Sequence, residues 1–396
     1  MRMSSFIAKI WREVFGQAHL KPEREPEQPS AAWIREHVHA AIGEEALQNN
    51  SDEIYRQWPL PVAPRPSAPA VNVEPTKELP PDQPGNVQTD MDKVFEGQEP
   101  KAPPPSLLVG WLSDPGIKRR NLPNEDSLFA AKGTRLHHTQ PQPFGLFIVA
   151  DGMGGYAHGQ EASRLAIQMV IDRVLPHVPE SDGLNAADFR KLLIEGVQAA
   201  NLVIHERNLE QHMEMGTTIT AALILGSTAV VVNVGDSRTY LYRESEGLRK
   251  ITRDHSLVAY LVETGIIKAD DIYMHPKRNQ IYRSLGPKPM VSVDAFTEQL
   301  QPGDTLLLCS DGLWEMVRDP LIQHLLRKEA TPLQTSGALV EAALEGGGAD
   351  NVSVIVVYTT GATGHREMIG LQLLSKPETV EIPDCYKASQ SGHRNG

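Results

Sequence analysis

The stretch PFGLFIVADGMGG, residues 143–155, decides the fold. Its apolar run Phe144–Val149 predicts a buried strand, because short uninterrupted apolar runs bounded by turn residues are typical of buried strands. The run stops at Asp151, and the glycines that follow allow a tight turn and a close approach of the backbone. A carboxylate is therefore expected at the end of a buried strand, next to a glycine-rich turn.

Further carboxylates lie at the ends of other apolar runs. They are Asp311 in DTLLLCSDGLW (304–314), Asp350 in GGGADNVSVIVV (346–357), Asp236 in AVVVNVGDSRTYLY (229–242), and Glu125 with Asp126 in PNEDSLFAA (123–131). A single Asp-Gly pair is common in turns, but five carboxylate-bearing strand ends in one domain favour a shared site. Carboxylates that lie close together raise one another's pKa unless a cation lies between them.

The ligand chemistry indicates which cation would bind there. Oxygen ligands without Cys or His select hard divalent ions, Mg²⁺ or Mn²⁺. Such ions activate water and neutralise charge, so the sequence predicts hydrolysis or transfer at phosphorus. Arg119 and Arg120 precede Glu125 and could hold a phosphate dianion through a bidentate guanidinium. An exposed turn with solvated charges is the alternative, and spacing alone favours neither.

The chain has 396 residues, which at roughly 150 residues per domain predicts two to three domains. Thirteen prolines fall in the 47 residues from Pro59 to Pro105, and such a stretch cannot form helices or central strands. We therefore expect four regions. They are a helix-prone segment 1–57, a proline-rich, acidic and disordered linker 58–106, a globular domain 107–360, and a disordered tail 361–396.

The first residues have a helical apolar face, formed by Phe6, Ile7, Ile10, Trp11, Val14 and Phe15. With Lys9 and Arg12 on the other side, this segment could dock on a membrane surface or on a partner protein. A short helix packed on its own domain is the alternative, and the sequence leaves both open.

Composition excludes several classes of protein. The net charge of −12 argues against non-specific nucleic-acid binding, which needs a basic surface. The two cysteines, Cys309 and Cys385, exclude a disulfide framework and a cysteine-rich zinc site, and they fit a reducing compartment. No apolar run has the length of a transmembrane helix or of a signal-peptide core, so we expect a soluble, cytoplasmic protein.

The order of the predicted elements indicates the fold class. Strand-like runs arrive in adjacent pairs, and two long helical patterns, one after Gly159 and one over about 186–211, arrive together. This order favours an α+β fold with two packed antiparallel sheets flanked by helices over alternating βαβ units.

Eight motifs, in this order, resemble those of the metal-dependent protein phosphatases of type 2C, the PPM family. They are NEDS (124–127), DGMGG (151–155), GTT (216–218), GDSR (235–238), TRDHS (252–256), RSLG (283–286), SDGLW (310–314) and GGADNVSV (347–354). The match covers about residues 107–360, and the ordered set is far more specific than any one motif. DGMGG, in place of the DGHGG common in eukaryotic members, resembles the bacterial branch.

The resemblance implies the same two-sheet fold and the dephosphorylation of phosphoserine and phosphothreonine proteins with two Mn²⁺ or Mg²⁺ ions. Such an enzyme would oppose a bacterial Ser/Thr kinase, and we expect a monomer that binds phosphorylated proteins and no nucleic acid. By the same resemblance, Asp151 bridges both ions and the Gly152 carbonyl coordinates one of them. Asp311 and Asp350 bind the other.

The remaining site residues are assigned in the same way. Glu125 and Asp126 act mostly through water, and Asp236 with Asp311 holds a weaker third ion. The resemblance implies that a metal-bridging hydroxide attacks phosphorus in line, so that no phosphoenzyme forms. The flap beside the site, which contacts substrate in relatives, corresponds to residues 257–290.

Two departures from the family pattern bear on catalysis. The phosphate-binding Arg usually lies three residues after a Gly and three before the Asn of NED, but Arg119 to Asn124 is longer by two. We favour Arg119, with Arg120 as the alternative. Met153 replaces a proposed general-acid His of eukaryotic members, so metal-bound water would protonate the leaving oxygen. His158 lies nearby but is expected on the surface.

Other interpretations remain open at this point. The chain could be a binding protein built on a degenerate phosphatase domain, which only the Arg119 spacing favours. It could also be a small-molecule phosphatase, but such an enzyme would lack GDSR and the terminal DN motif in this order. Cys309 and Trp314 are expected to be buried core residues and not catalytic groups.

Overall fold

A computed structural model describes residues 106–138, 140–154, 157–178, 184–361 and 370–375. The predicted helix-prone segment 1–57 and the predicted linker up to residue 105 lie outside the described residues. The first described strand, β1, begins at Ser106, directly after the last proline of the proline-rich stretch.

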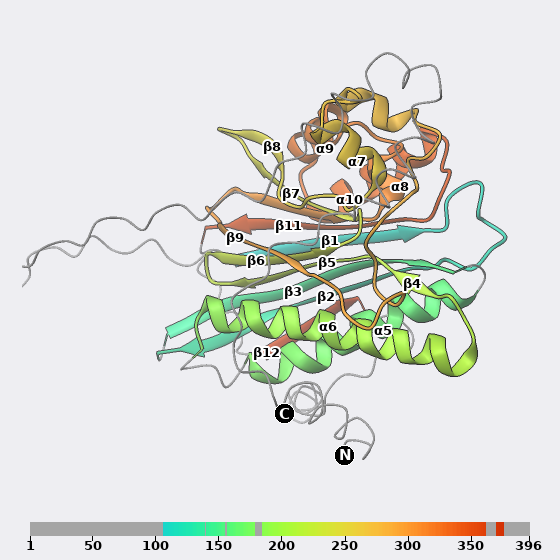
Figure 1. The fold of residues 1–396 in the computed structure, drawn as a ribbon. Helices are drawn as coiled ribbons and strands as arrows, with labels where there is room; N and C mark the ends of the chain where they lie inside the picture. Colours follow the sequence, from blue (N-terminus) through green and yellow to red (C-terminus); the bar gives the residue numbers. More distant parts are fainter. Residues whose placement is uncertain (1–105, 139, 155–156, 179–183, 362–369, 376–396) are drawn as a thin grey trace, which may run out of the picture. The chain divides into compact units, whose positions relative to one another are not determined.

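Two antiparallel sheets form the centre of the fold (Figure 1). The first has the order β1-β11-β10-β7-β8, with bounds β1 Ser106–Asp114, β7 Arg238–Arg243, β8 Gly247–Lys250, β10 Thr305–Cys309 and β11 Val352–Thr360. The second has the order β12-β2-β3-β5-β6-β9, and β4 pairs with β3; the bounds are β2 Asp126–His137, β3 Gln140–Met153, β4 Gly216–Thr217, β5 Ile219–Leu225, β6 Thr228–Val234, β9 Asp294–Gln299 and β12 Gly370–Ser375.

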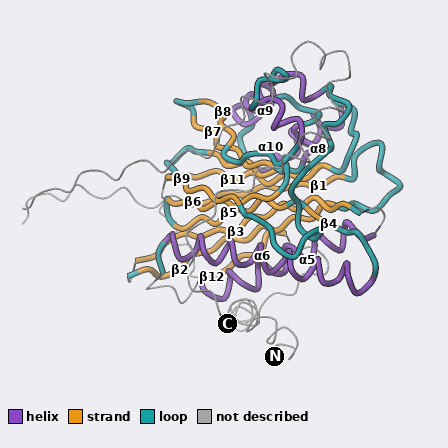
Figure 2. The backbone as a smooth tube through the Cα atoms, viewed as in Figure 1, coloured by secondary structure: helices purple, strands orange, loops and turns teal. Residues whose placement is uncertain are grey.

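Helices cover the outer faces of both sheets, which gives four layers (Figures 1 and 2). On the second sheet lie α5 (Ala157–Val174) and α6 (Ala186–Gln211), and a short 3-10 turn, Leu175–His177, follows α5. On the first sheet lie α8 (Asp311–Trp314), α9 (Asp319–Lys328) and α10 (Pro332–Glu345). The connection from β8 to β9 contains α7 (Leu257–Glu263) and the 3-10 turn Ala269–Tyr273. This architecture confirms the predicted α+β class.

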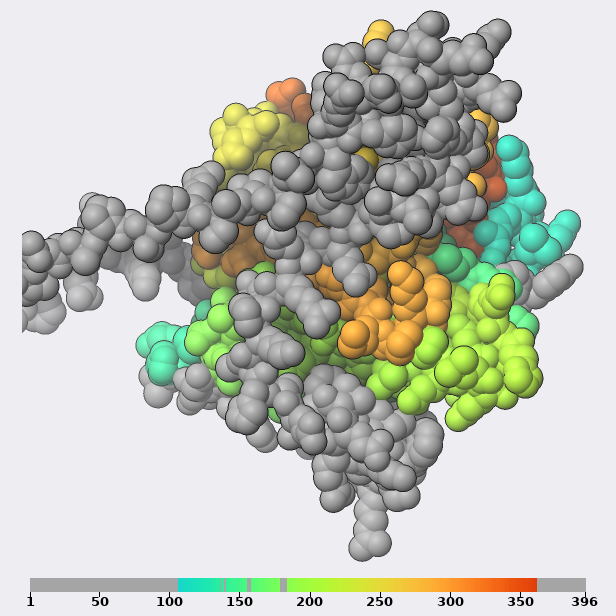
Figure 3. Space-filling view, in the orientation of Figure 1, coloured from blue at the N-terminus to red at the C-terminus, as the bar shows by residue number. Residues whose placement is uncertain are grey.

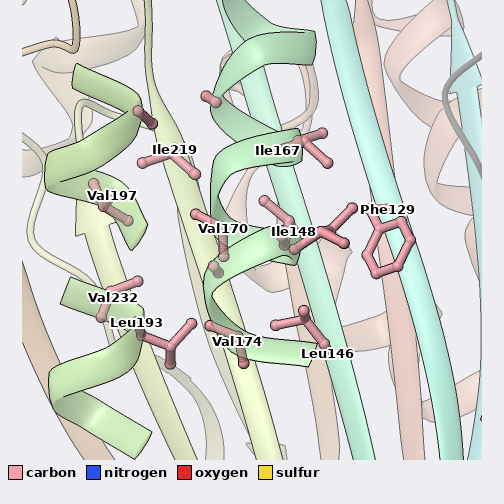
Figure 4. Close-up of a cluster of buried hydrophobic side chains, with 14 of the residues drawn as sticks. Phe129, Leu146, Ile148, Ile167, Val170, Val174, Leu193, Val197, Ile219 and Val232 are labelled. Atoms are coloured by element: carbon pink, nitrogen blue, oxygen red, sulfur yellow. The ribbon is translucent and has the colours of Figure 1, made fainter. Parts of the chain in front are cut away.

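The uninterrupted apolar run in β3 is explained by burial on both of its faces. Successive residues of a strand point to opposite sides of the sheet. Leu146 and Ile148 pack with the α5 and α6 side chains (Figure 4), whereas Phe147 and Val149 pack between the two sheets. A strand in this position needs no alternation of polar residues.

Local sequence signals also fix the helix ends. The Asn185 side chain caps α6 by accepting hydrogen bonds from the backbone N–H groups of residues 187 and 188, and the Asp188 carboxylate accepts one from the backbone N–H of Asn185. This capping box begins the helix at Ala186, as predicted. No helix among the described residues is long and apolar enough to cross a membrane.

The tail departs from the prediction of disorder over 361–396. Residues Gly370–Ser375 form β12, which pairs with β2 at the edge of the second sheet. The prediction was wrong for these six residues. In GLQLLS, apolar and polar residues alternate over only three positions, which is too short a pattern to recognise, and the exposed edge of β2 supplies the pairing partner.

Candidate active site

Three of the predicted carboxylates lie at the same end of the first sheet. The register places the end of β10 beside the starts of β7 and β11. Asp311 follows β10 by two residues, Asp236 precedes β7 by two, and Asp350 precedes β11 by two. Antiparallel pairing therefore gathers carboxylates that lie as much as 114 residues apart in the chain, from 236 to 350.

The second sheet contributes a carboxylate pair to the same region. Asp126 of β2 lies directly opposite Asp151 of β3, so both side chains project from the same face, with Cβ atoms about 5 Å apart. The Ser310 hydroxyl, one residue before Asp311, donates to Asp126 Oδ2 at 2.7 Å. This bond joins the strand ends of the two sheets.

Hydrogen bonds to its backbone N–H and carbonyl hold Glu125 in place. Its N–H donates to Asn351 Oδ1 at 2.9 Å, and its carbonyl accepts from Gly152 N at 3.2 Å and from Ser163 Oγ at 2.7 Å. A Cβ on Gly152 would lie 2.0 Å from the Gly159 carbonyl oxygen, so no other residue fits there without a backbone shift. The predicted close approach is therefore present at this glycine.

Thr218 connects the Asp151 and Asp236 loops. Its N–H donates to the Asp151 carbonyl at 2.8 Å, and its hydroxyl accepts from Asp151 N at 3.1 Å. The same hydroxyl lies 2.7 Å from Ser237 Oγ, beside Asp236. Sequence reasoning gave no role to Thr218, Asn351 or Ser310, although each belongs to one of the quoted motifs.

Arg119 is the arginine that reaches the carboxylates. Its Nη1 donates to Asp350 Oδ1 at 2.5 Å, and its Nη2 pairs with Glu125 Oε2. The spacing from Arg119 to Asn124, which is two residues longer than in the family pattern, contains a turn. In this turn Leu122 N donates to the Arg119 carbonyl at 2.8 Å. Arg120 is exposed on the same turn.

Burial and mutual repulsion raise the pKa values of the carboxyl groups. Burial, reinforced by Asp311 as the strongest neighbouring charge, holds the pKa of Asp151 well above its ordinary value. Asp311 is likewise raised by burial and then by Asp236. Burial raises the pKa of Asp126 and of Asp236 to about 7 each. Such values indicate a site whose negative charge lacks enough compensating cation.

Four buried carboxylate oxygens at this site make no hydrogen bond within the described part of the chain: Glu125 Oε1, Asp126 Oδ1, Asp311 Oδ1 and Glu315 Oε1. Buried acceptors without a donor are costly unless a cation satisfies them. In the described ranges, no three His, Cys, Asp or Glu side chains are arranged as a ready metal site. Arg119 lies among the carboxylates and pairs with Glu125 and Asp350. The unsatisfied all-oxygen donor set nevertheless fits hard divalent ions.

Glu315 is a carboxylate of this site that sequence reasoning missed. It follows Asp311 by four residues, so the two side chains lie on one side of the α8 turn. The Glu315 side chain is 6% exposed, and its Oε2 accepts from Arg278 Nε at 3.0 Å. Its four-residue spacing from Asp311 could have indicated that the two side chains lie together on a helix, but α8 is too short to be recognised as a helix from sequence.

The residues predicted to have no chemical role lie as expected. Cys309 is buried in β10, and burial raises the pKa of its thiol far above the range of a nucleophile. His158 is exposed on α5. Trp314 is fully buried in the core between the first sheet and its helices.

The raised pKa values predict how metal binding stabilises the protein at different pH. A carboxyl with a folded pKa of about 7 favours folding when protonated. In metal-free protein that stability is present below about pH 4, the unfolded pKa, and is lost as the pH rises through about 7. Divalent ions need the ionised carboxylates. The rise in melting temperature on adding Mg²⁺ should therefore be larger at about pH 7.5 than at about pH 5.5.

Scanning calorimetry measures this difference, with NaCl at matched ionic strength as the control. An equal Mg²⁺-dependent rise at both pH values would contradict the link between these carboxylates and a metal site.

Comparison with known proteins identifies the family. The protein phosphatase 2C family matches residues 116–345. The serine/threonine phosphatase stp of Listeria monocytogenes serotype 4b is 37% identical over 236 residues, which cover 59% of this chain and 89% of the relative. The serine/threonine protein phosphatase PstP of Mycobacterium tuberculosis is 38% identical over 252 residues, which cover 63% of this chain and 44% of the relative.

Solved structures agree with the fold. A serine/threonine phosphatase of S. agalactiae superposes with a TM-score of 0.55 at 30% identity, over 64% of this chain and 99% of that one. The catalytic domain of PstP in complex with two manganese ions gives 0.52 at 34% identity, over 64% and 100%. The family match over residues 116–345 contains Arg119 and the strand-end carboxylates other than Asp350, and it makes up more than half of the chain, so the chain belongs to the protein phosphatase 2C family.

Proposed function

We propose that the chain is a metal-dependent protein serine/threonine phosphatase that hydrolyses phosphoserine and phosphothreonine in phosphorylated proteins. The observation that carries this conclusion is the gathering of carboxylates from both sheets at one place, with unsatisfied buried oxygens and with Arg119 among them. The names of the two relatives described above, both serine/threonine phosphatases, support the substrate class.

Two Mn²⁺ or Mg²⁺ ions and a weaker third are the cofactors that this donor set suits. Asp151 and the Gly152 carbonyl would hold one ion, and Asp151 with Asp311 and Asp350 would hold the other. Glu125, Asp126 and Asp236 would be the remaining ligands or supports, and Asp236 together with Asp311 would hold the third ion. When bound, the ions supply activated water and neutralise charge on the phosphate.

The chain itself positions the substrate. Arg119 holds its planar pair of N–H donors between Glu125 and Asp350, and a phosphate dianion that replaces these two carboxylates as acceptor would be bound by both donors. The Asp126–Ser310 and Glu125–Asn351 bonds fix the surrounding strand ends, so the backbone of the site needs little rearrangement when phosphate binds. Met153 carries no proton that it could donate as a general acid, and His158 is exposed on α5.

Arg119→Ala is expected to lower kcat/KM for a phosphothreonine peptide by about 100-fold, because it removes a bidentate, charge-assisted contact to the phosphate. Arg119→Lys should recover only part of the loss, since an ammonium does not reproduce the planar fork. Arg120→Ala is the matched control and should stay within about threefold of the wild type, since surface charges contribute little. A larger loss in Arg120→Ala would assign the phosphate contact to the other arginine.

We place substrate selection in the predicted flap, residues 257–290. Arg278 anchors it to Glu315 beside Asp311, and Met274 is 81% exposed. The last part of the flap packs on α6, where Asn201 donates to the Lys288 carbonyl at 2.9 Å; this segment is orange and α6 is yellow-green in Figure 3. The flap is therefore anchored to the body while exposing side chains to a substrate.

The cellular setting belongs to the same proposal. A monomer in the cytoplasm that signals by opposing a bacterial Ser/Thr kinase fits the low cysteine content of the sequence and the bacterial relatives. Docking through residues 1–57 would bring it to a membrane or to a partner. Hydrolysis of a phosphothreonine peptide by the whole purified chain tests the activity on which this setting depends.

A further inference from the structure

Trp314 makes a contact that a purely hydrophobic core residue does not need. Its ring is fully buried, and its indole N–H donates to the main-chain carbonyl of Asp236 at 3.0 Å. Trp314 is the last residue of α8, and Asp311 is the first. One short helix therefore carries the Asp311 carboxylate at its start and holds the Asp236 backbone from its end.

The indole ring is itself fixed. The Arg238 guanidinium carbon lies 3.7 Å from the ring centre, which is a close cation–π contact. Arg238 is buried and paired with Asp254 at 2.7 Å, and it also donates to the Tyr240 hydroxyl at 2.8 Å. With its partners in place, Arg238 restrains the ring plane, so the indole N–H has a defined direction.

The neighbours of Asp236 are held by other parts of the chain. His255 makes two hydrogen bonds to Gly235, each of 3.0 Å. Its ring Nδ1 accepts from Gly235 N, and its backbone N–H donates to the Gly235 carbonyl. Ser237 is held by Thr218. The bond from Trp314 differs from these, because it ties the Asp236 main chain directly to the helix that begins at Asp311.

We propose that Trp314 is a positioning residue for the weaker cation site, and that its indole N–H sets the spacing between the Asp236 and Asp311 carboxylates. The inference rests on the proposed function, because it requires a cation at those two groups. A site whose ligands are held in place before binding loses less free energy in ordering them. Loss of the N–H should therefore weaken this site while leaving the ligands themselves unchanged.

Trp314→Phe tests the inference, since it keeps an aromatic ring and removes the N–H. Tyr358→Phe is the matched control: it removes an aromatic donor to a backbone carbonyl, that of Glu329, in the same apolar cluster. Electron paramagnetic resonance of free Mn²⁺ gives the number and affinity of bound ions in the whole chain. In Trp314→Phe we expect the weakest site to bind about tenfold less tightly, the effect of one lost hydrogen bond.

The two tighter sites should be unchanged in Trp314→Phe, and all sites should be unchanged in Tyr358→Phe. Identical Mn²⁺ binding in Trp314→Phe and wild type would overturn the inference and leave the proposed function standing. A wild type that binds no Mn²⁺ would overturn the proposed function and the inference with it.

A measurement on the wild type covers the case in which Trp314→Phe does not fold. In ¹⁵N-labelled whole chain, the indole N–H of Trp314 should give a resonance protected from solvent exchange, because it is buried and hydrogen-bonded. Mg²⁺ should shift that resonance with the midpoint of the weakest site. If no protected indole resonance responds to Mg²⁺, the inference is wrong.

Discussion

Asp151→Asn and Asp311→Asn should each lower Mn²⁺-dependent hydrolysis of a phosphothreonine peptide by at least about 1,000-fold. An amide in place of either carboxylate removes the charge that holds the ions and with it the electrostatic stabilisation of the transition state. The measurement is kcat/KM at saturating Mn²⁺. Metal-free protein should meanwhile become more stable, because each substitution removes one of several repelling buried carboxylates.

Asp304→Asn is the matched control. Asp304 is 2% exposed and lies just before β10, at the end of the strand opposite Asp311. Its carboxylate pairs with Arg243 at 2.8 Å, away from the site. This variant should lose stability and keep its activity. Full activity in Asp151→Asn, or equal losses of activity in all three variants, would contradict the assignment of the site.

Gly152→Ala should destabilise the fold by more than about 3 kcal/mol, because the added methyl group meets backbone atoms and not flexible side chains. Its Cβ would lie 2.0 Å from the Gly159 carbonyl oxygen and 2.7 Å from the Glu125 carbonyl oxygen. Relief requires the Asp151 turn to move away from Glu125, so metal binding should be lost as well. The midpoint of urea unfolding measures the first effect, and Mn²⁺ binding measures the second.

Gly337→Ala is the control for Gly152→Ala. Gly337 lies inside α10, and a Cβ there would meet nothing within 4 Å. Because alanine favours the helix over glycine, this variant should be more stable than the wild type by about 0.5–1 kcal/mol. A Gly152→Ala protein as stable as the wild type would contradict the close approach seen at this turn.

The sequence was sufficient to predict the fold class and the carboxylates, because their signals are local. The apolar run of β3 indicates burial on both faces, and Asp151 and Asp311 each lie two residues after such a run. Antiparallel pairing then brings strand ends together, whatever the length of the loops between them. The motif order of the family added the expected roles of these residues.

Contacts that depend on distant parts of the chain could not be predicted. The spacing of Arg119 left its place open, whereas the structure brings it to Asp350, 231 residues away. The bond from Trp314 to Asp236 and the pairing of β12 with β2 likewise depend on tertiary contacts and have no local signal. Glu315 needed the short α8 helix to place it beside Asp311.

The most direct test of the account is hydrolysis of a phosphothreonine peptide by the whole wild-type chain with and without Mn²⁺. The account predicts turnover with Mn²⁺, none after chelation of divalent ions, and recovery when Mn²⁺ is restored. If the purified, folded protein shows no turnover of phosphopeptides at saturating Mn²⁺, the gathered carboxylates do not form an active phosphatase site.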